Sequence, residues 1–395
     1  MNILHVIQAY EPFIGGGVKN FKCISEELVR RGHTVSIYTS TALDTKGFTS
    51  LRHGKRLKNA PHVREENGIK VFRFRPLILP LLQWKIDQIY YGPTIPGMFL
   101  EYRKNKDAFD LVHSTTMPFT HNYHAFRLAR SSNIPYVCTP AVKVLDLKHY
   151  RSKAVETLRR ASAIIVRVRF EKKILVNKYR VKPERIHYVG VGINPQNFEN
   201  VDGSSFRRAY GLRDEKLILF VGRLALPKGF HYLIKAFIKE FGGKRAYKLV
   251  LIGPMSIPAK MIKDSIPSAL KEQIIFTGPI YDRRFLADAY SAADIFVNPS
   301  ADDNFGVVFI EAWASGTPVI GARFGGVMDL IKEGIDGLFV EFGNVEDLRK
   351  KMSFLIENKD IRQRLGNMGR RRALKDYTWT IIVDKIERIY RECIS

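Results

Sequence analysis

Two cations follow a predicted buried strand in the second half of the chain. Arg223 comes directly after the apolar run 217–221 and Gly222, and Lys228 lies five residues further on. Open α/β sheets bind their ligands beyond the carboxyl ends of the strands. Two cations at such a position could neutralise a diphosphate before and after a bond to it breaks. Ordinary surface roles for both residues are the alternative.

Two carboxylates stand eight residues apart further along the chain. Asp303 and Glu311 flank Phe305 and Gly306. If a helix begins near Gly306, Glu311 lies in its second turn and Asp303 in the loop before it. One carboxylate could then accept hydrogen bonds from a ribose diol and the other from sugar hydroxyls. The backbone N–H groups of Gly306, Val307 and Val308 would then face the same cleft, and a helix start can hold phosphate.

Asp303 also has simpler interpretations. An aspartate before a helix is commonly its N-terminal cap. Asp302 and Asp303 together could be an acidic metal-binding pair, but no third ligand is evident in the sequence. We therefore expect no metal site.

A third candidate is the run Gly15-Gly16-Gly17, which follows a predicted strand and opens a predicted helix. Glycines allow a ligand to approach the backbone, and the helix start offers N–H groups to an anion. The run does not match GxxxxGK[ST], which disfavours nucleotide hydrolysis of the P-loop type. A plain tight turn is the alternative.

Strand and helix patterns alternate along most of the chain, which predicts parallel sheets covered by helices on both faces. We expect two doubly wound domains, 1–193 and 194–378, with a tail helix in 379–395 that packs back on the first. The predicted strands are 3–7, 34–39, 111–112, 136–139, 163–168, 185–189, 217–221, 248–252, 274–276, 295–298 and 318–321. The predicted helices are 18–31, 229–241, one from near 306 to 312–315, and 379–394.

The chain is strongly basic, with a net charge of +25. The first 195 residues carry 33 Lys and Arg against 14 Asp and Glu, and the remaining residues carry 31 against 25. This asymmetry indicates an anionic partner of the first half: nucleic acid, phospholipid headgroups or a phosphorylated substrate. Zinc-finger spacing, basic-region heptads and RNP-like aromatic motifs are missing from the sequence, which disfavours nucleic acid.

The three cysteines and the apolar runs bear on the compartment. Cys23, Cys138 and Cys393 show neither metal-ligand spacing nor a disulfide framework, so a reducing, cytoplasmic setting fits best. The sequence contains no uninterrupted apolar run of about 18 residues, and we expect no spanning helix.

The stretch 46–106 does not fit the alternation. It interleaves Lys and Arg with Leu, Ile, Trp and Tyr, as in KRLK and RFRPLILPLLQWK. It could be an irregular insertion with its own packing. It could also dock on a membrane, with apolar groups in the headgroup zone and cations on lipid phosphates.

The second half closely resembles the family 4 glycosyltransferases. The resemblance rests on Gly222 through Lys228 and on the block AYSAADIFVNPSADDNFGVVFIEAWASGTPVIGARFGGVMDLI, and it extends more weakly to the glycine run and VGVGIN. Members of this family are retaining enzymes with the GT-B fold, in which two Rossmann-like domains face each other across a cleft. The resemblance implies that fold here.

The family's functional residues can be carried over by position. Arg223 and Lys228 match its diphosphate-binding pair, and Glu311 matches the second glutamate of its E-x7-E signature, which binds the ribose. Asp303 stands where the first glutamate contacts the transferred sugar, and its side chain is one methylene shorter. Gly16 and the adjoining Gly17 match the loop that approaches the donor phosphates.

The first half departs from the family at its histidines. Family members often carry H-x-H after the fourth strand, and the second histidine commonly faces the reacting sugar. Here only His113 of that motif is present, and His121 and His124 follow. Any of the three could line the cleft, and His113, His121 and Asp303 are the predicted catalytic residues.

The resemblance predicts a retaining, metal-independent glycosyltransferase that uses a nucleotide-diphosphate sugar and no cofactor. The basic first half favours an anionic or lipid-linked envelope glycan acceptor on the cytoplasmic face of a membrane. The alternatives are an inactive homologue acting as a partner subunit, a sugar phosphorylase or epimerase, and a nucleic-acid-binding protein.

Overall fold

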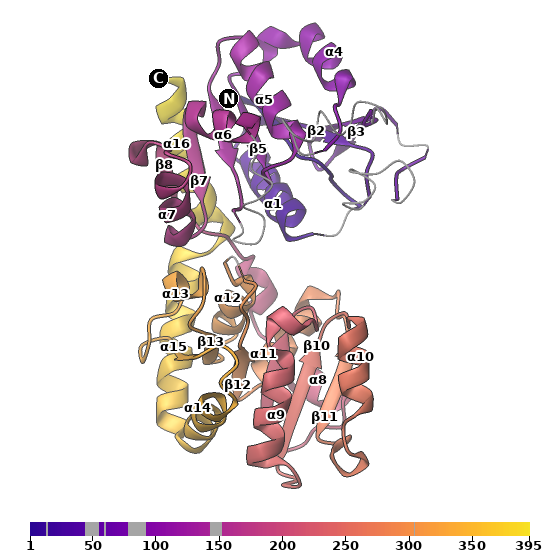
Figure 1. Cartoon of the computed structure of the whole chain (residues 1–395), viewed down its shortest axis with the longest axis vertical. Helices are drawn as coiled ribbons and strands as arrows, with labels where there is room; N and C mark the ends of the chain where they lie inside the picture. Colours follow the sequence, from indigo (N-terminus) through magenta and orange to yellow (C-terminus); the bar gives the residue numbers. More distant parts are fainter. Residues whose placement is uncertain (13–14, 44–54, 59–60, 78–91, 143–151, 304) are drawn as a thin grey trace. The chain divides into compact units, whose positions relative to one another are not determined.

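The computed structural model describes residues 1–395 except 13–14, 44–54, 59–60, 78–91, 143–151 and 304. The chain forms two compact units (Figure 1). Unit 1 consists of Met1–Gly190 together with Trp379–Ser395, and unit 2 consists of Val191–Thr378.

Unit 1 is built on an eight-stranded sheet with the order β3-β4-β2-β1-β5-β6-β7-β8. Neighbouring strands are parallel, except that β3 runs antiparallel to β4. The strands are β1 Asn2–Val6, β2 Thr34–Ser40, β3 Val63–Glu66, β4 Ile69–Phe74, β5 Leu111–Thr115, β6 Tyr136–Thr139, β7 Ala163–Val166 and β8 Ile186–Tyr188. The direction of strand succession reverses between β1 and β5, which makes their carboxyl ends the topological switch point.

Both faces of this sheet are covered. Ile3 packs into one hydrophobic cluster and the next residue, Leu4, into another, because successive side chains of a strand point to opposite faces. The covering helices are α1 Gly16–Arg30, α4 Pro96–Lys104, α5 Thr120–Ser131, α6 Ser152–Arg160, α7 Arg169–Asn177 and α16 Trp379–Ile394.

Part of the stretch 46–106 was expected to lie outside the strand and helix alternation, and that expectation is wrong. β4 pairs in parallel with β2, and Ile69 and Val71 are fully enclosed in the core. In α4, Met98 is buried. Of the two cations in β4, Lys70 is exposed, whereas Arg73 is buried and pairs with Glu66 at 2.9 Å. Residues 78–91, which contain much of the suggested membrane surface, lie outside the described residues.

The tail helix α16 packs on unit 1 against α1 and β7 (Figure 1). The Tyr390 hydroxyl lies 3.2 Å from Nε2 of His5 and 2.5 Å from Nδ1 of His113. Arg31 in turn donates to the carboxylates of Asp384 at 2.5 Å and Glu387 at 3.2 Å. The helix is thus fixed by a buried polar cluster on one side and an ion-pair network at the surface.

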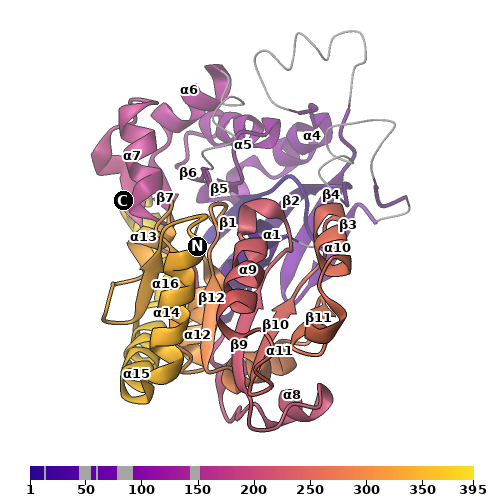
Figure 2. The same cartoon turned by 60° about the horizontal axis from the view of Figure 1, so that its bottom comes forward.

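Unit 2 contains a six-stranded, fully parallel sheet with the order β11-β10-β9-β12-β13-β14 (Figure 2). The strands are β9 Lys216–Val221, β10 Tyr247–Ile252, β11 Ile274–Gly278, β12 Ile295–Asn298, β13 Val319–Ala322 and β14 Gly337–Val340. This is the Rossmann order, and its switch point lies between β9 and β12.

Helices also cover both faces of the unit 2 sheet. They are α8 Ser204–Ala209, α9 Phe230–Phe241, α10 Ile257–Asp264, α11 Arg283–Ala292, α12 Val307–Ala314, α13 Val327–Leu330, α14 Val345–Glu357 and α15 Lys359–Asp376. Trp313 of α12 is fully buried and donates through Nε1 to the Asp336 carbonyl at 2.7 Å. A Cβ at Gly369 would lie 2.2 Å from the Trp313 ring, so α15 needs glycine to pack this closely. Among the described residues, no helix is long and apolar enough to cross a membrane.

Candidate functional site

The predicted cations of unit 2 meet Asp303, one of the two predicted carboxylates, at its topological switch point. Arg223 follows the end of β9, and the segment 299–303 follows the end of β12, the neighbouring strand in the sheet. Carboxyl ends of parallel strands open on the same edge, so the two loops lie beside one another. The sequence places charged residues in both loops, where a doubly wound sheet presents its ligand site.

Gly229 allows the two loops to approach closely. Its φ is +70°, and a Cβ there would lie 2.1 Å from the carbonyl oxygen of Pro299. Two residues before it, the Pro227 carbonyl accepts a 2.9 Å hydrogen bond from the Ala301 backbone N–H. The turn that carries Lys228 is therefore held against the end of β12 by backbone contacts on both sides.

This approach places Lys228 among the acidic residues. Its Nζ donates to the Asp302 carbonyl at 2.6 Å and to Oδ1 of Asp303 at 2.8 Å. The side chain is 14% exposed, so the ammonium is largely enclosed by these partners. The second oxygen of Asp303, Oδ2, is buried and makes no hydrogen bond to the described residues. Asp303 is thus the partner of Lys228 rather than the cap of α12.

Arg223 is the open member of the cluster. Its side chain is 62% exposed, and Nη2 lies 3.5 Å from Oδ2 of Asp302. The same carboxylate oxygen is 4.0 Å from Nζ of Lys228. Asp302 was considered in the sequence only as a metal ligand, but in the structure it faces both cations.

Glu311 lies on α12 with a side chain that is 10% exposed. The hydroxyl of Tyr290, on α11, donates to its Oε2 at 3.0 Å, and Nη1 of Arg283 is 3.8 Å from Oε1. Burial and the neighbouring Glu311 carboxylate raise the pKa of Tyr290 well above its usual value, so the phenol stays a donor. Neither Tyr290 nor Arg283 has a signal in the sequence, because their position depends on how α11 packs on α12.

The helix that carries Glu311 begins at Val307, directly after Gly306. Gly306 has φ +77°, and a Cβ there would lie 2.6 Å from the ring of Phe309, so glycine is required at this helix start. Phe305 is buried, and its ring centroid lies 6.0 Å from that of Tyr377. No side-chain cap bonds to the start of this helix among the described residues, and the Phe305 ring belongs to the core of unit 2.

In unit 1, the predicted glycines also lie at a switch point. α1 begins at Gly16, after β1, and a Cβ at Gly16 would meet nothing within 4 Å. A Cβ at Gly17 would lie 3.2 Å from Oγ1 of Thr116, in the loop after β5. The start of α1 thus packs against the β5 loop, and its backbone at Gly16 is open.

His113 occupies a different environment from the one predicted for a catalytic residue. It is fully buried within β5, with Nδ1 bonded to the Tyr390 hydroxyl and Nε2 to Oγ1 of Thr139 at 2.8 Å. Burial, with the nearby His5, keeps its pKa well below the usual value. Both ring nitrogens are engaged inside unit 1, so the structure encloses His113 in a polar cluster with Tyr390 and Thr139.

His121 and His124 begin α5, beyond the carboxyl end of β5. His121 Nε2 donates to the Thr115 carbonyl at 2.8 Å. Burial lowers the pKa of His121 to about 3 and that of His124 to about 4. His121 is therefore neutral at physiological pH and a poor general base, and it lies in α5, beyond the carboxyl end of β5.

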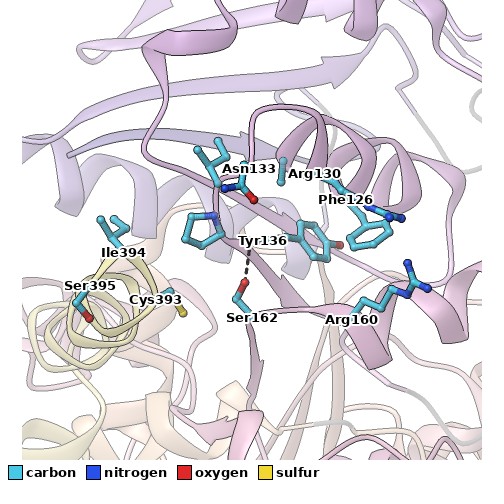
Figure 3. Close-up of a pocket in the computed structure, with 12 residues that line it drawn as sticks. Phe126, Arg130, Asn133, Tyr136, Arg160, Ser162, Cys393, Ile394 and Ser395 are labelled. Carbon is cyan, nitrogen blue, oxygen red and sulfur yellow. Dashed lines mark hydrogen bonds between the residues drawn. The ribbon is translucent and has the colours of Figure 1, made fainter.

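A pocket of about 540 Å³ lies at the opposite edge of the unit 1 sheet (Figure 3). It is lined by the start of β6, where the backbone of Tyr136 donates to Ser162, and by Arg130 and Arg160. It contains none of the predicted site residues. Across the described part of the chain, no group of three or more His, Cys, Asp or Glu could hold a metal ion.

Comparisons with known proteins agree with this arrangement. The family model "Glycosyl transferases group 1" matches residues 204–372, and "Glycosyltransferase Family 4" matches residues 14–197. Together the two models cover most of the chain. The chain belongs to this family of glycosyltransferases.

Individual relatives are distant but extend over long parts of the chain. An uncharacterised glycosyltransferase of Methanocaldococcus jannaschii is 26% identical over 99% of this chain and 98% of its own length. A D-inositol 3-phosphate glycosyltransferase of Corynebacterium glutamicum is 27% identical over 76% of each chain. The crystal structure of Anabaena HepE in complex with UDP is 18% identical, covers 99% of this chain and 100% of its own, and superposes with a TM-score of 0.76. The fold is therefore GT-B.

Proposed function

We propose that this glycosyltransferase moves a sugar from a nucleotide-diphosphate donor to an acceptor and binds the donor on unit 2. The observation that carries the proposal is the cluster that Arg223 and Lys228 form with Asp302 and Asp303 at the β9/β12 switch point. Glu311 follows on α12, the next helix in the chain. Similarity to Anabaena HepE, whose structures hold UDP and UDP-glucose, supports a nucleotide sugar as donor.

In this proposal the two cations and the start of α12 hold the diphosphate. Arg223 is exposed and can turn toward phosphate oxygens, while Lys228 is fixed by Asp303. The N–H groups from Gly306 onward add a partial positive charge. Charge that grows on the leaving phosphate as the glycosidic bond breaks is then stabilised by donors already in place.

The two carboxylates bind the hydroxyls of the donor. Glu311 is buried and oriented by Tyr290, so one of its oxygens can accept from the ribose diol. Oδ1 of Asp303 accepts a hydrogen bond from Lys228, and Oδ2 can accept one from a sugar hydroxyl. A buried carboxylate oxygen that gains a hydrogen bond in the complex contributes both affinity and orientation.

We infer a retaining reaction from family membership. The site in unit 2 has no carboxylate pair assigned on both sides of an anomeric carbon, as a retaining glycosidase would need. We therefore prefer a scheme in which the nucleotide diphosphate leaves from the same face of the sugar that the acceptor attacks. An oxygen of the departing phosphate then takes the proton of the acceptor hydroxyl. His121, which is neutral and buried, would then shape the site on unit 1 without acting as a base.

We propose an anionic or lipid-linked glycan as acceptor, met at the cytoplasmic face of a membrane, because the first half of the chain carries most of the net charge. Co-sedimentation with vesicles checks this. Binding to vesicles of anionic phospholipid and not to neutral ones is expected, and equally weak binding to both would favour a soluble acceptor.

The donor site is tested by thermal stabilisation with UDP, GDP and ADP and their glucose and mannose derivatives, without added metal. A ligand that binds the folded state raises its unfolding temperature by mass action. We expect a shift with one base, which is lost in Glu311→Ala. No shift with any nucleotide would instead favour an inactive homologue.

Lys228→Ala should cost on the order of 2–4 kcal/mol of transition-state stabilisation in turnover assays, by analogy with the loss of single oxyanion donors. Lys235, on the exposed face of α9, supplies the matched control Lys235→Ala, which removes the same charge away from the cluster. Equal activity of the two variants would overturn the assignment of Lys228.

A further inference from the structure

Asp302 has no role in the donor site as proposed so far, yet its carboxylate faces both phosphate-binding cations. Its Oδ2 lies 3.5 Å from Nη2 of Arg223 and 4.0 Å from Nζ of Lys228. With Asp303 at 2.8 Å from Lys228, the cluster contains two positive and two negative groups. The cations that should attract a diphosphate are therefore electrically balanced within the chain.

The backbone of Asp302 is fixed, and this defines where its carboxylate stands. Its N–H donates to Oγ of Ser300 at 3.0 Å, and its carbonyl accepts from Lys228 at 2.6 Å. Ser300 itself is 1% exposed. The aspartate side chain, 15% exposed, thus projects from an anchored loop toward Arg223.

The ion pair with Arg223 is loose enough to exchange. Its 3.5 Å separation is long for a charge-assisted hydrogen bond, and the guanidinium is mostly solvated. An exposed ion pair of this kind can weaken the binding of a competing diphosphate by no more than about 5-fold. A diphosphate offers several oxygens and more charge, so it can take Arg223 from the carboxylate at a modest cost.

We propose that Asp302 is an internal counter-ion that competes with the donor diphosphate for Arg223. The Asp302 carboxylate pairs with Arg223 before the donor binds. This ion pair breaks when Arg223 turns to the donor diphosphate, and it forms again as the nucleoside diphosphate leaves. This positioning residue thereby weakens product binding and speeds product release. The inference deepens the proposed function and rests on it.

The test is calorimetric titration of UDP, GDP and ADP into the full chain and into Asp302→Asn, which keeps the side-chain shape and removes the charge. We expect the variant to bind the preferred diphosphate about 3- to 5-fold more tightly and to release it more slowly. The advantage should shrink as salt is raised from about 0.05 to 0.5 M, because charge competition is screened.

Asp214→Asn is the matched control. Asp214 is exposed just before the amino end of β9, about 20 Å along the strand from Arg223, and its loss changes the net charge equally. The control should bind like the natural chain. If it gained as much affinity as Asp302→Asn, net charge rather than local competition would be the cause, and the inference would fail.

A double-mutant cycle separates competition from a structural role. In an Arg223→Gln background the effect of Asp302→Asn should fall to less than about 2-fold, because its main partner is absent. Unchanged or weaker binding by Asp302→Asn, in a variant that unfolds at the normal temperature, overturns the inference while the donor site stands. If neither the natural chain nor the variant binds any diphosphate, the proposed function itself is wrong.

Discussion

Gly229 holds the turn of Lys228 against the end of β12, and replacing it with alanine tests whether this approach builds the site. The added Cβ would lie 2.1 Å from the Pro299 carbonyl oxygen, a backbone atom that cannot turn aside. Gly211 provides the matched control. It has a similar left-handed φ of +63°, but a Cβ there would meet nothing within 4 Å.

The difference between the two variants isolates the contact. Alanine in a left-handed conformation costs about 1–2 kcal/mol, which both variants lose. Gly229→Ala adds an overpacking cost of about 1–3 kcal/mol. At about 2–4 °C for each kcal/mol in a unit of this size, we expect a drop of roughly 2–8 °C for Gly211→Ala. The drop for Gly229→Ala should be about 2–12 °C greater than that of the control.

Nucleoside diphosphate affinity should also differ between the two variants. Relief of the clash moves the turn and separates Lys228 from Asp303, so Gly229→Ala should lose nucleoside diphosphate affinity at temperatures where it is fully folded. Gly211→Ala should keep it. Calorimetric melting and titration of both variants provide the measurements. Equal melting temperatures and equal affinities would refute the reasoning that backbone approach at Gly229 positions the cation.

Three further outcomes are expected. Tyr390→Phe removes the hydroxyl that contacts His5 and His113, and should lower the free energy of unfolding by about 1–3 kcal/mol in thermal or urea melts; an unchanged value would contradict that role. His5 and His121 have pKa values of about 3 in the folded chain, below the usual 6.5, because they are buried. Below pH 6.5 the unfolded state therefore binds more protons than the folded state. The free energy of unfolding should fall by about 2 kcal/mol for each of these histidines between pH 7 and pH 5. A free energy of unfolding that does not change over this range in urea melts would contradict the argument. Glu311→Gln keeps the shape of the side chain but weakens its acceptor, and should reduce nucleotide affinity about 10-fold in titrations; unchanged affinity would exclude Glu311 from the ribose site.

The sheets could be predicted closely where strands are apolar and bounded by turns. The predicted strands 136–139 and 295–298 coincide with β6 and β12. β3 was missed because VREE carries no apolar alternation and pairs only at the sheet edge. β4 was missed for a different reason, since Lys70 and Arg73 within its apolar run resembled a membrane-binding pattern, although Arg73 is buried and paired with Glu66. A segment at the edge of a sheet becomes a strand because it pairs with the adjacent strand, and the local sequence pattern does not reveal that pairing.

The site was predictable in composition but not in its pairings. Motif spacing identified Arg223, Lys228 and Glu311 as candidates. That Asp303 binds Lys228 depends on two loops 75 residues apart in sequence and on the close approach at Gly229. The environment of His113 is set by Tyr390, 277 residues away, on a helix whose packing face the sequence does not specify. Contacts of this range are decided by tertiary packing.

The return of α16 to unit 1 has a consequence for how the chain is synthesised. Unit 2 is one continuous segment, whereas the core of unit 1 includes Ile382, Val383 and Ile386, which are translated after all of unit 2. Unit 2 can therefore complete its core while unit 1 still exposes the groove that α16 will fill. His5 and His113 remain without their Tyr390 partner during this interval. Unit 1 is therefore the first unit to be translated and the last to complete its core.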